Sequence, residues 1–433
     1  MMEKKYYPLS RTQKEIIFFE DECPGTAINS ICALYQCEGD FADTMEKVVN
    51  SLVEHEQSFR LRMHKTEDGE WVQYEVPYEY FSVPRYPEAV TYEKMQEIAQ
   101  AKSEEPFEVA DSPLYKFEIF QGEGITYICC TLHHIINDGC GMALLGIMLT
   151  YGWRAVEGIA PYEWVHHRFT DFIEKENSPA KQKRREKDAA YWQEKFADWN
   201  GPACVKPGFE APDDSYDGTR IERQLTDEED AELNSFFEKD GISSAVLFQT
   251  ALIIYLYTRN PDRRRIDIGN MIMNRPTAAD KETIGNYAAE VMLCVPVAPD
   301  MTVMELIDAV GQANKDSYRH SSYLHDDIVE YLSEKCGEEV SICDVEFGFM
   351  PSMVEQLLED VGGELPLTGE AFSAGIPETT MEYYVYNLTE GPLLLKMDYR
   401  LNMFSAEEAQ QLFDDIWSIA QRCTRENCTL KEF

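Results

Sequence analysis

The stretch TLHHIINDGCGMALLG, residues Thr131–Gly146, lies between two segments whose apolar residues follow different patterns. The residues just before it, 125–132, form a short run rich in β-branched and apolar side chains, which is typical of a strand. From residue 142 to 156 the sequence is apolar over a length that favours a helix. The pattern therefore predicts a strand, a loop over residues 133 to 141 and a helix, with the loop mounted on two rigid elements.

This loop carries His133, His134, Asp138 and Gly139, in the pattern H-H-x-x-x-D-G. An imidazole is the side chain whose ordinary pKa is nearest to neutral, so it can act as a base, and a nearby carboxylate can hold local geometry. Gly139 and Gly141 suit a sharp turn in which a side chain would obstruct the backbone or an approaching substrate. We assign the candidate site to this loop.

A second segment has the same histidine and aspartate spacing. VHHRFTDF contains His166, His167 and Asp171, so spacing alone does not identify a site. This copy lacks the glycine, follows no β-rich run and precedes a charged segment instead of an apolar helix. We therefore interpret its histidines as packing or surface residues.

Other site chemistries find little support. Cys140 lies beside the motif, but no feature indicates a lowered thiol pKa, so we interpret it as a small packing residue. The sequence has no G-x-S-x-G elbow and no phosphate-binding loop. Its 12 cysteines include no C-x-x-C pair and no second pair or spaced histidines that would complete a zinc site. We expect reduced thiols, no metal and no covalently bound cofactor.

Helices and strands alternate along the chain without internal repeats, so the predicted class is mixed α and β. The charged run EKENSPAKQKRREK, residues 174–187, marks the expected boundary between a lobe over residues 1–176, which carries the motif, and a second lobe over residues 177–433. The predicted helices are 10–20, 41–56, 142–156, 245–257 and 405–422, and Ser405 is the expected N-cap of the last one. The predicted strands are 27–36, 59–63, 125–132, 266–273 and 291–297. A hairpin is expected from strands 385–388 and 393–399, with its turn at Glu390 and Gly391.

Length and charge limit the function. A chain of 433 residues is long enough for two compact lobes. Its 79 acidic and 39 basic residues give a formal net charge of −40, which disfavours nucleic acid and anionic membranes as partners. The first residues lack the apolar stretch of a secretory signal, and the longest apolar run is shorter than the roughly 20 residues that cross a bilayer. We expect a cytoplasmic protein.

The motif and its setting resemble the chloramphenicol-acetyltransferase-like superfamily, and in particular the condensation domains of nonribosomal peptide synthetases. PLSRTQKEIIFFE (8–20) is similar to the S-x-x-Q segment that opens these domains, and HEQSFRLRM (55–63) is similar to their H-E-x-L-R motif. Further similar segments are TDFI (170–173), AAYW (189–192), GNMIMNRP (269–276) and IGNYAAEVMLCVPV (284–297). The resemblance extends over nearly the whole chain in the same order.

The resemblance implies a V-shaped pseudo-dimer of two lobes with a central channel, and acyl transfer from a phosphopantetheine thioester on a carrier protein to an amine. It makes His134 the catalytic histidine, which takes a proton from the acceptor or positions it. His133, Asp138 and Gly139 would support the site, with Asp138 paired to Arg60 or Arg62. A thioester is already activated, so the reaction needs a positioned base and no metal.

Two alternatives stay open. One is an O-acyltransferase that forms an ester from acyl-CoA and an alcohol, and the other is a degenerate, non-enzymatic module that docks carrier proteins. Ala289 and Glu290 stand where condensation domains usually have asparagine and threonine, and EFGFMP (346–351) is only faintly similar to the D-F-G-W-G motif of plant-type acyltransferases. The thioester donors are anionic, so an acidic enzyme needs a local basic patch. The sequence offers Lys181, Lys183, Arg184, Arg185, Lys187 and Arg263, Arg264, Arg265, which we interpret as solvated surface.

Overall fold

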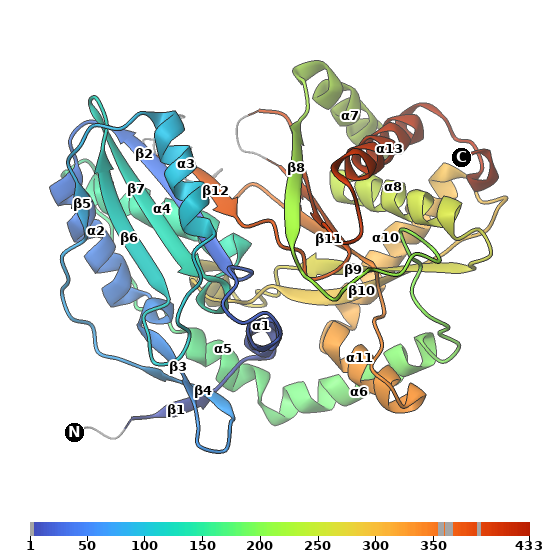
Figure 1. The fold of residues 1–433 in the computed structure, drawn as a ribbon, viewed down its shortest axis with the longest axis horizontal. Helices are drawn as coiled ribbons and strands as arrows, with labels where there is room; N and C mark the ends of the chain where they lie inside the picture. The colour runs from blue at the N-terminus through green and yellow to red at the C-terminus, as the bar shows by residue number, and fades with distance from the viewer. Residues whose placement is uncertain (1–3, 354–358, 360–366, 388–390) are drawn as a thin grey trace. The chain divides into compact units, whose positions relative to one another are not determined.

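The structure is a computed structural model that describes residues 4–353, 359, 367–387 and 391–433. The chain forms two compact units (Figure 1). Unit 1 contains residues 1–178, 273–288 and 353–374, and unit 2 contains residues 179–272, 289–352 and 375–433. The junction at Ser178 and Pro179 lies two residues after the predicted boundary. The prediction of two continuous lobes is wrong, however, because two later stretches of the chain fold with unit 1.

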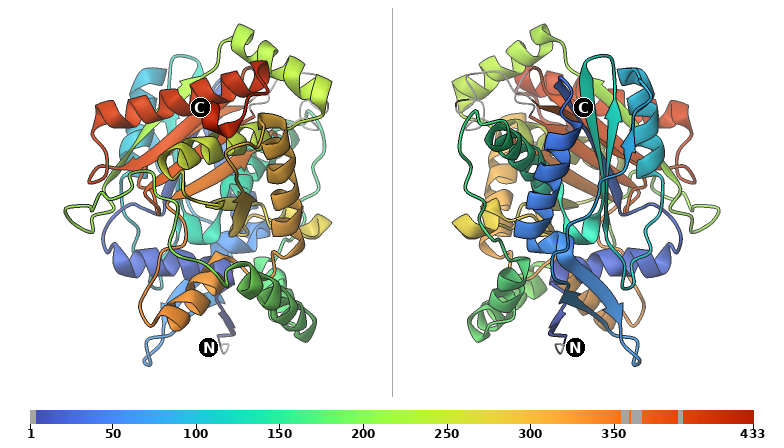
Figure 2. Two further views of the ribbon diagram at one scale, coloured as in Figure 1. Left: turned by 90° about the vertical axis from the view of Figure 1, so that its right-hand side faces the viewer. Right: turned by 90° about the vertical axis from the view of Figure 1, so that its left-hand side faces the viewer.

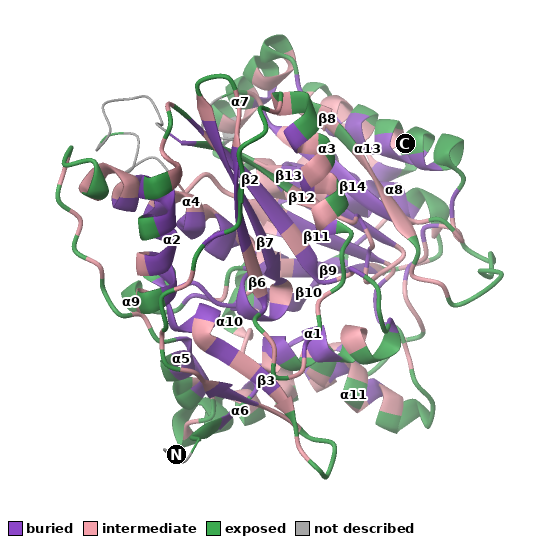
Figure 3. Ribbon diagram, turned by 60° about the vertical axis from the view of Figure 1, so that its left-hand side comes forward, coloured by how far each residue is buried: buried purple, intermediate pink, exposed green. Residues whose placement is uncertain are grey.

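Unit 1 is built on a five-stranded sheet in the order β12-β2-β7-β6-β5. Its strands are β12 (Thr368–Ser373), β2 (Ser30–Glu38), β7 (Ile125–His133), β6 (Tyr115–Gln121) and β5 (Arg85–Tyr86). Side chains of β2 alternate between two cores, since Ala33 and Tyr35 face one and Cys32 and Leu34 face the other. The sheet is therefore buried on both faces, which explains the continuous apolar character of β7 (Figure 3).

Helices cover both faces of this sheet. α2 (Ala42–His55) and α4 (Gly139–Val156) contact each other over the larger core, whereas α3 (Tyr92–Ser103) covers the opposite face. The remaining described elements of unit 1 are the small sheet β1 (Tyr6–Pro8), β4 (Trp71–Glu75) and β3 (Leu61–Lys65), the helices α1 (Arg11–Glu22), α5 (Phe169–Glu176) and α9 (Ala278–Glu282), and the 3-10 turns η1 (Gln57–Arg60) and η2 (His134–Ile136).

Unit 2 is built on a six-stranded sheet in the order β10-β9-β11-β13-β14-β8. Its strands are β10 (Ala289–Pro296), β9 (Arg265–Ile272), β11 (Val345–Met350), β13 (Met381–Tyr386), β14 (Leu394–Arg400) and β8 (Gly218–Gln224). Three helices pack their apolar sides on one face of the sheet: α8 (Ser244–Arg259), α10 (Val303–Arg319) and α13 (Ala406–Arg425). The other face carries a smaller core with α6 (Pro179–Lys195) and α11 (His325–Cys336), and α7 (Asp227–Asp240) and η3 (Leu430–Glu432) complete the described elements (Figure 2).

The predicted helices and strands are present with small shifts of their ends. Ser405 caps α13 with its hydroxyl on the Glu408 N–H, as predicted. The strand predicted from Phe59 begins only at Leu61, because residues 57–60 form η1. β13 and β14 pair antiparallel, but the predicted strand 385–388 overlaps β13 only at Val385 and Tyr386, and Leu388 and Glu390 lie outside the described residues. No single described helix is long and apolar enough to cross a membrane, although the bent pair of α7 and α8 passes that test by length and composition.

Candidate active site

The histidine loop lies between β7 and α4, as predicted. His133 is the last residue of β7, His134 begins η2, and Asp138 is the N-cap of α4. The loop is short and almost entirely buried, so each polar group in it needs a partner inside the protein. Those partners show which side chains hold the loop and which ring nitrogen they leave unused.

Asp138 is completely buried and accepts four hydrogen bonds. Its Oδ1 accepts from the Gly141 N–H at 2.7 Å and from Arg275 Nη2 at 2.7 Å. Its Oδ2 accepts from the N–H groups of Tyr287 and Ala288 at 2.9 and 3.0 Å. A carboxylate with both oxygens engaged in this way fixes structure and cannot act as a base.

Arg275 is the partner of Asp138, so the predicted pairing with Arg60 or Arg62 is wrong. Arg60 is held by Glu75 at 2.7 Å and by carbonyl oxygens at the end of α2, including that of Val53. Arg62 donates to the carbonyls of Phe59 and Leu61. Arg60 ends η1 and Arg62 lies in β3, and nearby carbonyls, with Glu75 for Arg60, use their donors locally.

Arg275 is buried and is itself held by backbone. It donates to the carbonyl oxygens of Asp280 and Thr283 at 2.6 Å each, and its guanidinium lies 4.2 Å from the ring centroid of Tyr287. The segment 273–288 thus returns to unit 1 and closes over the histidine loop, which explains why it belongs to that unit.

His133 has a structural role. Its Nδ1 accepts from the Ile135 N–H at 3.1 Å, so the proton sits on Nε2, which donates to Glu20 Oε1 at 3.0 Å. The side chain is 1% exposed and its ring packs edge-on against Phe107. Both nitrogens are used, and none remains for a substrate.

His134 differs from His133 in two ways. Its side chain is only half-buried, and one nitrogen of its ring is not bonded within the described part of the protein. Asn286 Nδ2 donates to the His134 carbonyl at 3.1 Å and lies 3.4 Å from Nδ1. No described residue hydrogen-bonds Nε2, so this is the ring nitrogen left for a substrate. Burial lowers the pKa of His134, while the charge of Asp138 works to raise it.

The structure adds supporting residues that the sequence analysis did not single out. Gln13 forms a capping box with Ser10 at the start of α1 and donates to the Ile135 carbonyl at 3.1 Å. Thr12 donates to the Asn286 carbonyl at 2.9 Å, which holds the residue that contacts His134. Ser10 and Gln13 form the S-x-x-Q pattern, so a capping box was the available signal for a role of this segment.

Gly139 and Gly141 are the first residues of α4, and neither has a positive φ. The turn expected there is therefore not a left-handed one. Gly141 is required for space, since a Cβ at that position would lie 2.0 Å from Asn137 Oδ1. Asn137 is fully buried and its amide has no hydrogen-bond partner among the described residues.

Cys140 and the second histidine pair do not form a site. Burial raises the pKa of Cys140 to about 11, with Asp138 as the next cause, so a thiolate is disfavoured. His166 is exposed and stacks on His55 with ring centroids 4.4 Å apart. Asp171 pairs with Arg168 at 3.5 Å. His167 is 11% exposed and its Nε2 lies 3.9 Å from Glu56 Oε1, so one histidine of the pair faces solvent and the other packs, as predicted.

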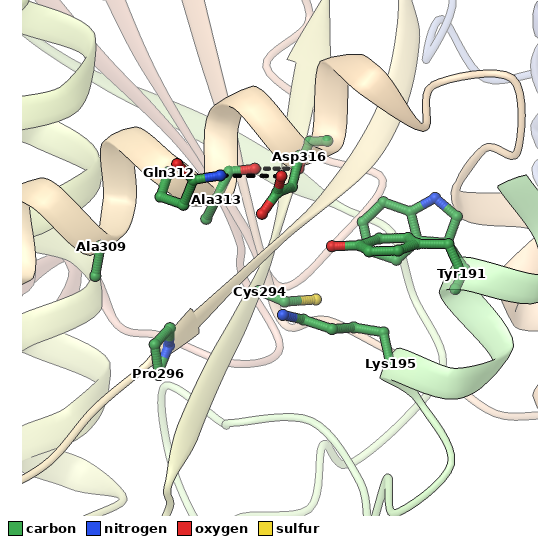
Figure 4. Close-up of a pocket in the computed structure, with 10 residues that line it drawn as sticks. Tyr191, Lys195, Cys294, Pro296, Ala309, Gln312, Ala313 and Asp316 are labelled. Atoms are coloured by element: carbon green, nitrogen blue, oxygen red, sulfur yellow. Dashed lines mark hydrogen bonds between the residues drawn. The ribbon is translucent and has the colours of Figure 1, made fainter.

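Unit 2 contains a small hollow of about 170 Å³ between α6, β10 and α10 (Figure 4). Tyr191 and Lys195 line it from α6, Cys294 from β10, and Gln312 and Asp316 from α10, where the Gln312 amide donates to Asp316 at 3.0 Å. Small-molecule pockets are about 300 Å³ or larger. We therefore do not assign a thioester substrate to this hollow.

The predicted basic clusters differ in how their charges are used. Arg263 donates to Asn200 and to the carbonyls of Gly201 and Pro202, and Arg265 donates to Asp267. These two arginines are half-buried and engaged within unit 2, so the interpretation of them as solvated surface is wrong. On α6, Lys183 and Lys187 are exposed.

The chain is similar to known proteins along nearly its whole length. The model of the condensation domain family matches residues 3–431. Among curated relatives, surfactin synthase subunit 1 of Bacillus subtilis is 25% identical over 95% of the chain, and bacitracin synthase 3 of Bacillus licheniformis is 23% identical over 95%. The chain spans only 12% and 6% of the lengths of these two proteins.

Solved structures have the same mixed α and β fold. A mutant of the starter condensation domain of rhizomide synthetase, solved with C8-CoA, is 19% identical with a TM-score of 0.84, over 99% of this chain and 97% of that one. The first condensation domain of the calcium-dependent antibiotic synthetase, solved with a substrate analogue, is 18% identical with a TM-score of 0.82, over 99% of both chains.

Proposed function

The chain belongs to the condensation-domain family, an amide-forming family of the acyltransferase type, and on this basis we propose that it transfers an acyl group from a phosphopantetheine thioester to an amine. The observation that carries the proposal is the difference between the two adjacent histidines. His133 uses both ring nitrogens inside the fold, whereas His134 keeps Nε2 free on a half-buried ring. A module that only docks carrier proteins has no need of this difference.

In the proposed reaction the acceptor amine attacks the thioester carbonyl. A C–N bond forms, and neutral His134 takes the amine proton on Nε2. The C–S bond then breaks, and the leaving thiolate receives the proton from the imidazolium, so that an amide and a free thiol are the products. Asp138, Arg275 and Asn286 do not touch the reacting atoms in this scheme, because their contacts position the loop that carries His134.

The donor thioester is either carrier-bound or coenzyme A. The likeness to a starter condensation domain that was solved with C8-CoA supports octanoyl-CoA as a first donor to test. A related structure of that domain contains Leu-SNAC, a small amine that carries a thioester, which supports the use of Leu-SNAC as the acceptor probe. These ligands belong to the neighbouring protein, so the assay also includes octanoyl-phosphopantetheine on a carrier protein and an alcohol acceptor.

The experiment measures product by mass spectrometry for the wild-type chain and for two matched variants. His134→Ala should lower turnover by roughly 10²- to 10⁴-fold, the usual contribution of a positioned base. His166→Ala changes the first histidine of the second pair and should leave turnover unchanged. Equal turnover of the wild type and His134→Ala would overturn the assigned role, and exclusive ester formation would favour the O-acyltransferase alternative.

A further inference from the structure

Unit 2 contains a second cluster of chemically reactive side chains, separate from the histidine loop. Glu290 lies at the start of β10, His325 is the first residue of α11, and Cys343 lies two residues before β11. Three segments that are separate in the sequence thus meet beside the six-stranded sheet. Glu290 and Cys343 are 5% and 3% exposed, so the cluster is largely closed to solvent.

The three side chains contact one another as a triangle. Cys343 Sγ lies 3.6 Å from Glu290 Oε1 and 4.0 Å from His325 Nε2, and His325 Nδ1 lies 3.3 Å from Glu290 Oε2. One donor atom from each residue lies within 4.8 Å of the other two. In tetrahedral zinc sites, bonds of about 2.0–2.3 Å place ligand atoms about 3.3–3.7 Å apart. The Sγ–Oε1 separation of 3.6 Å already lies in that range, and the Sγ–Nε2 separation of 4.0 Å needs to contract by about 0.3 Å.

The strand opposite the cluster leaves room for it. Gly269 of β9 pairs with Glu346 of β11, and a Cβ at Gly269 would lie 1.9 Å from Glu290 Oε1 and 3.3 Å from Glu346 Cγ. The glycine therefore lets the carboxylate of Glu290 lie directly over the backbone. Glu346 is 5% exposed and adds a second buried acidic group next to the thiol. Buried acidic groups that lie close together are commonly compensated by ion pairs or by a metal ion.

A cysteine nucleophile is the competing interpretation, because Glu290, His325 and Cys343 are the residue types of a catalytic triad. The geometry opposes it. Glu290 contacts the thiol as well as the imidazole, so the three groups do not form the linear relay that a triad uses.

We propose that Glu290 Oε1, His325 Nε2 and Cys343 Sγ bind a zinc ion. Thiolate, imidazole and carboxylate are the donors that zinc takes in proteins, and the mixed set disfavours calcium and magnesium, which take oxygen ligands. His325 Nδ1, the nitrogen that is not proposed as a ligand, lies 3.2 Å from Asp326 Oδ1 and 3.3 Å from Glu290 Oε2, so it has carboxylates to receive its proton. Such a second contact orients metal-binding histidines. The ion would tie the start of α11 to β10 and β11.

The test measures metal content and not activity, so it is independent of the proposed function. The purified chain is equilibrated with Zn²⁺ and dialysed, and its zinc content is measured by elemental mass spectrometry. A parallel sample is loaded with Co²⁺. We expect about one equivalent of zinc and, with cobalt, an absorption band from thiolate-to-metal charge transfer. Less than about 0.2 equivalents of zinc in the wild type would overturn the proposal.

Variants locate the ion. Cys343→Ser and Glu290→Gln keep the size of each side chain and should lower zinc content at least tenfold, and Cys343→Ser should also abolish the charge-transfer band. Cys336→Ser is the matched control, because Cys336 is an exposed thiol at the other end of α11 and should retain the full equivalent. Circular dichroism of each apoprotein checks that the variants are folded. Unchanged zinc content in folded Cys343→Ser would place the ion elsewhere and refute the assignment.

Discussion

Asp138 and Arg275 form a salt bridge of 2.7 Å in which both side chains are almost completely buried, although 137 residues separate them in the sequence. Asp138 caps the helix that follows the histidine loop, and Arg275 is held by the carbonyls of its own segment. The ion pair, together with the hydrogen bond from the Asn286 side chain to the His134 carbonyl, therefore fixes the loop of His134 to the segment 273–288.

Arg275→Met should destabilise the chain strongly, because it leaves the buried carboxylate of Asp138 without its cation. Removal of one partner of a buried pair costs about 3–5 kcal/mol. The free energy of unfolding in urea measures this loss. Arg425→Met is the matched control, since Arg425 forms a bidentate pair with Glu232 on the surface and its loss should change the midpoint little. Similar losses in both variants would contradict the assigned importance of the buried pair.

The rate of acyl transfer should persist at pH values below the ordinary imidazole pKa of 6.5. In the proposed reaction only neutral His134 can accept the amine proton, and burial lowers its pKa. The acid limb of kcat/KM for the octanoyl-CoA reaction measures this pKa in the free enzyme. Asn286→Asp would place an acidic group beside Nδ1 and should shift the acid limb of the kcat/KM profile to higher pH. His166→Ala, in the second histidine pair, should leave this acid limb unchanged. An acid limb of the wild type above 6.5 would show that His134 is not the titrating base.

Gly141→Ala tests whether the start of α4 needs an open position next to Asn137. The added Cβ would overlap the buried Asn137 amide at 2.0 Å, and overpacking of this kind costs about 1–3 kcal/mol. Gly311→Ala in α10 is the matched control, because nothing lies within 4 Å of its Cβ position. There the helix preference of alanine should raise stability by about 0.5–1 kcal/mol. A Gly141→Ala chain as stable as the wild type would show that Asn137 moves aside without cost.

Charge reversal on α6 tests how an acidic enzyme meets an anionic donor. Lys183→Glu with Lys187→Glu changes two exposed residues, whereas Arg263 and Arg265 already hold backbone and acidic groups. We interpret the exposed lysines as solvated surface, so the KM for octanoyl-CoA at low salt should stay within about twofold of the wild type. A KM that rises tenfold and recovers in high salt would instead identify α6 as the docking surface.

The sequence predicted the elements that carry the motif because their signals are local. The β-rich run before His133 and the apolar helix after Asp138 are read directly from neighbouring residues, and the context of His166 separated the second pair in the same way. Arg275 and Asn286 were missed as site residues, since they lie in a segment that sequence similarity assigned to the second lobe. Their role depends on a return of the chain to unit 1, which no local pattern records.

Glu56 illustrates the same limit and gives a prediction about pH. It belongs to the H-E segment that the resemblance identified, yet its role follows only from the segment 273–288, whose Ile284 N–H donates to it at 3.0 Å. Burial raises the pKa of Glu56 to about 8, although this hydrogen bond and the charges of Arg60 and Arg275 lower it. The ordinary value is 4.5, so folding favours the protonated form.

The contribution of Glu56 to the free energy of unfolding should therefore be fully present below pH 4.5. It should be lost as the pH rises through about 8, where the buried carboxyl ionises. Glu56→Gln removes this loss and should stabilise the chain relative to the wild type at pH 9, by on the order of 1–3 kcal/mol. Glu75→Gln is the comparison variant, for which we expect a change in stability of the opposite sign. Burial works to raise the pKa of Glu75, but hydrogen bonds from Gln57 and Arg60 outweigh it and lower the pKa, so this variant should be less stable than the wild type at neutral pH. Urea unfolding from pH 5 to 9 measures both, and a Glu56→Gln chain that loses stability at pH 9 would show that Glu56 is needed there as a carboxylate.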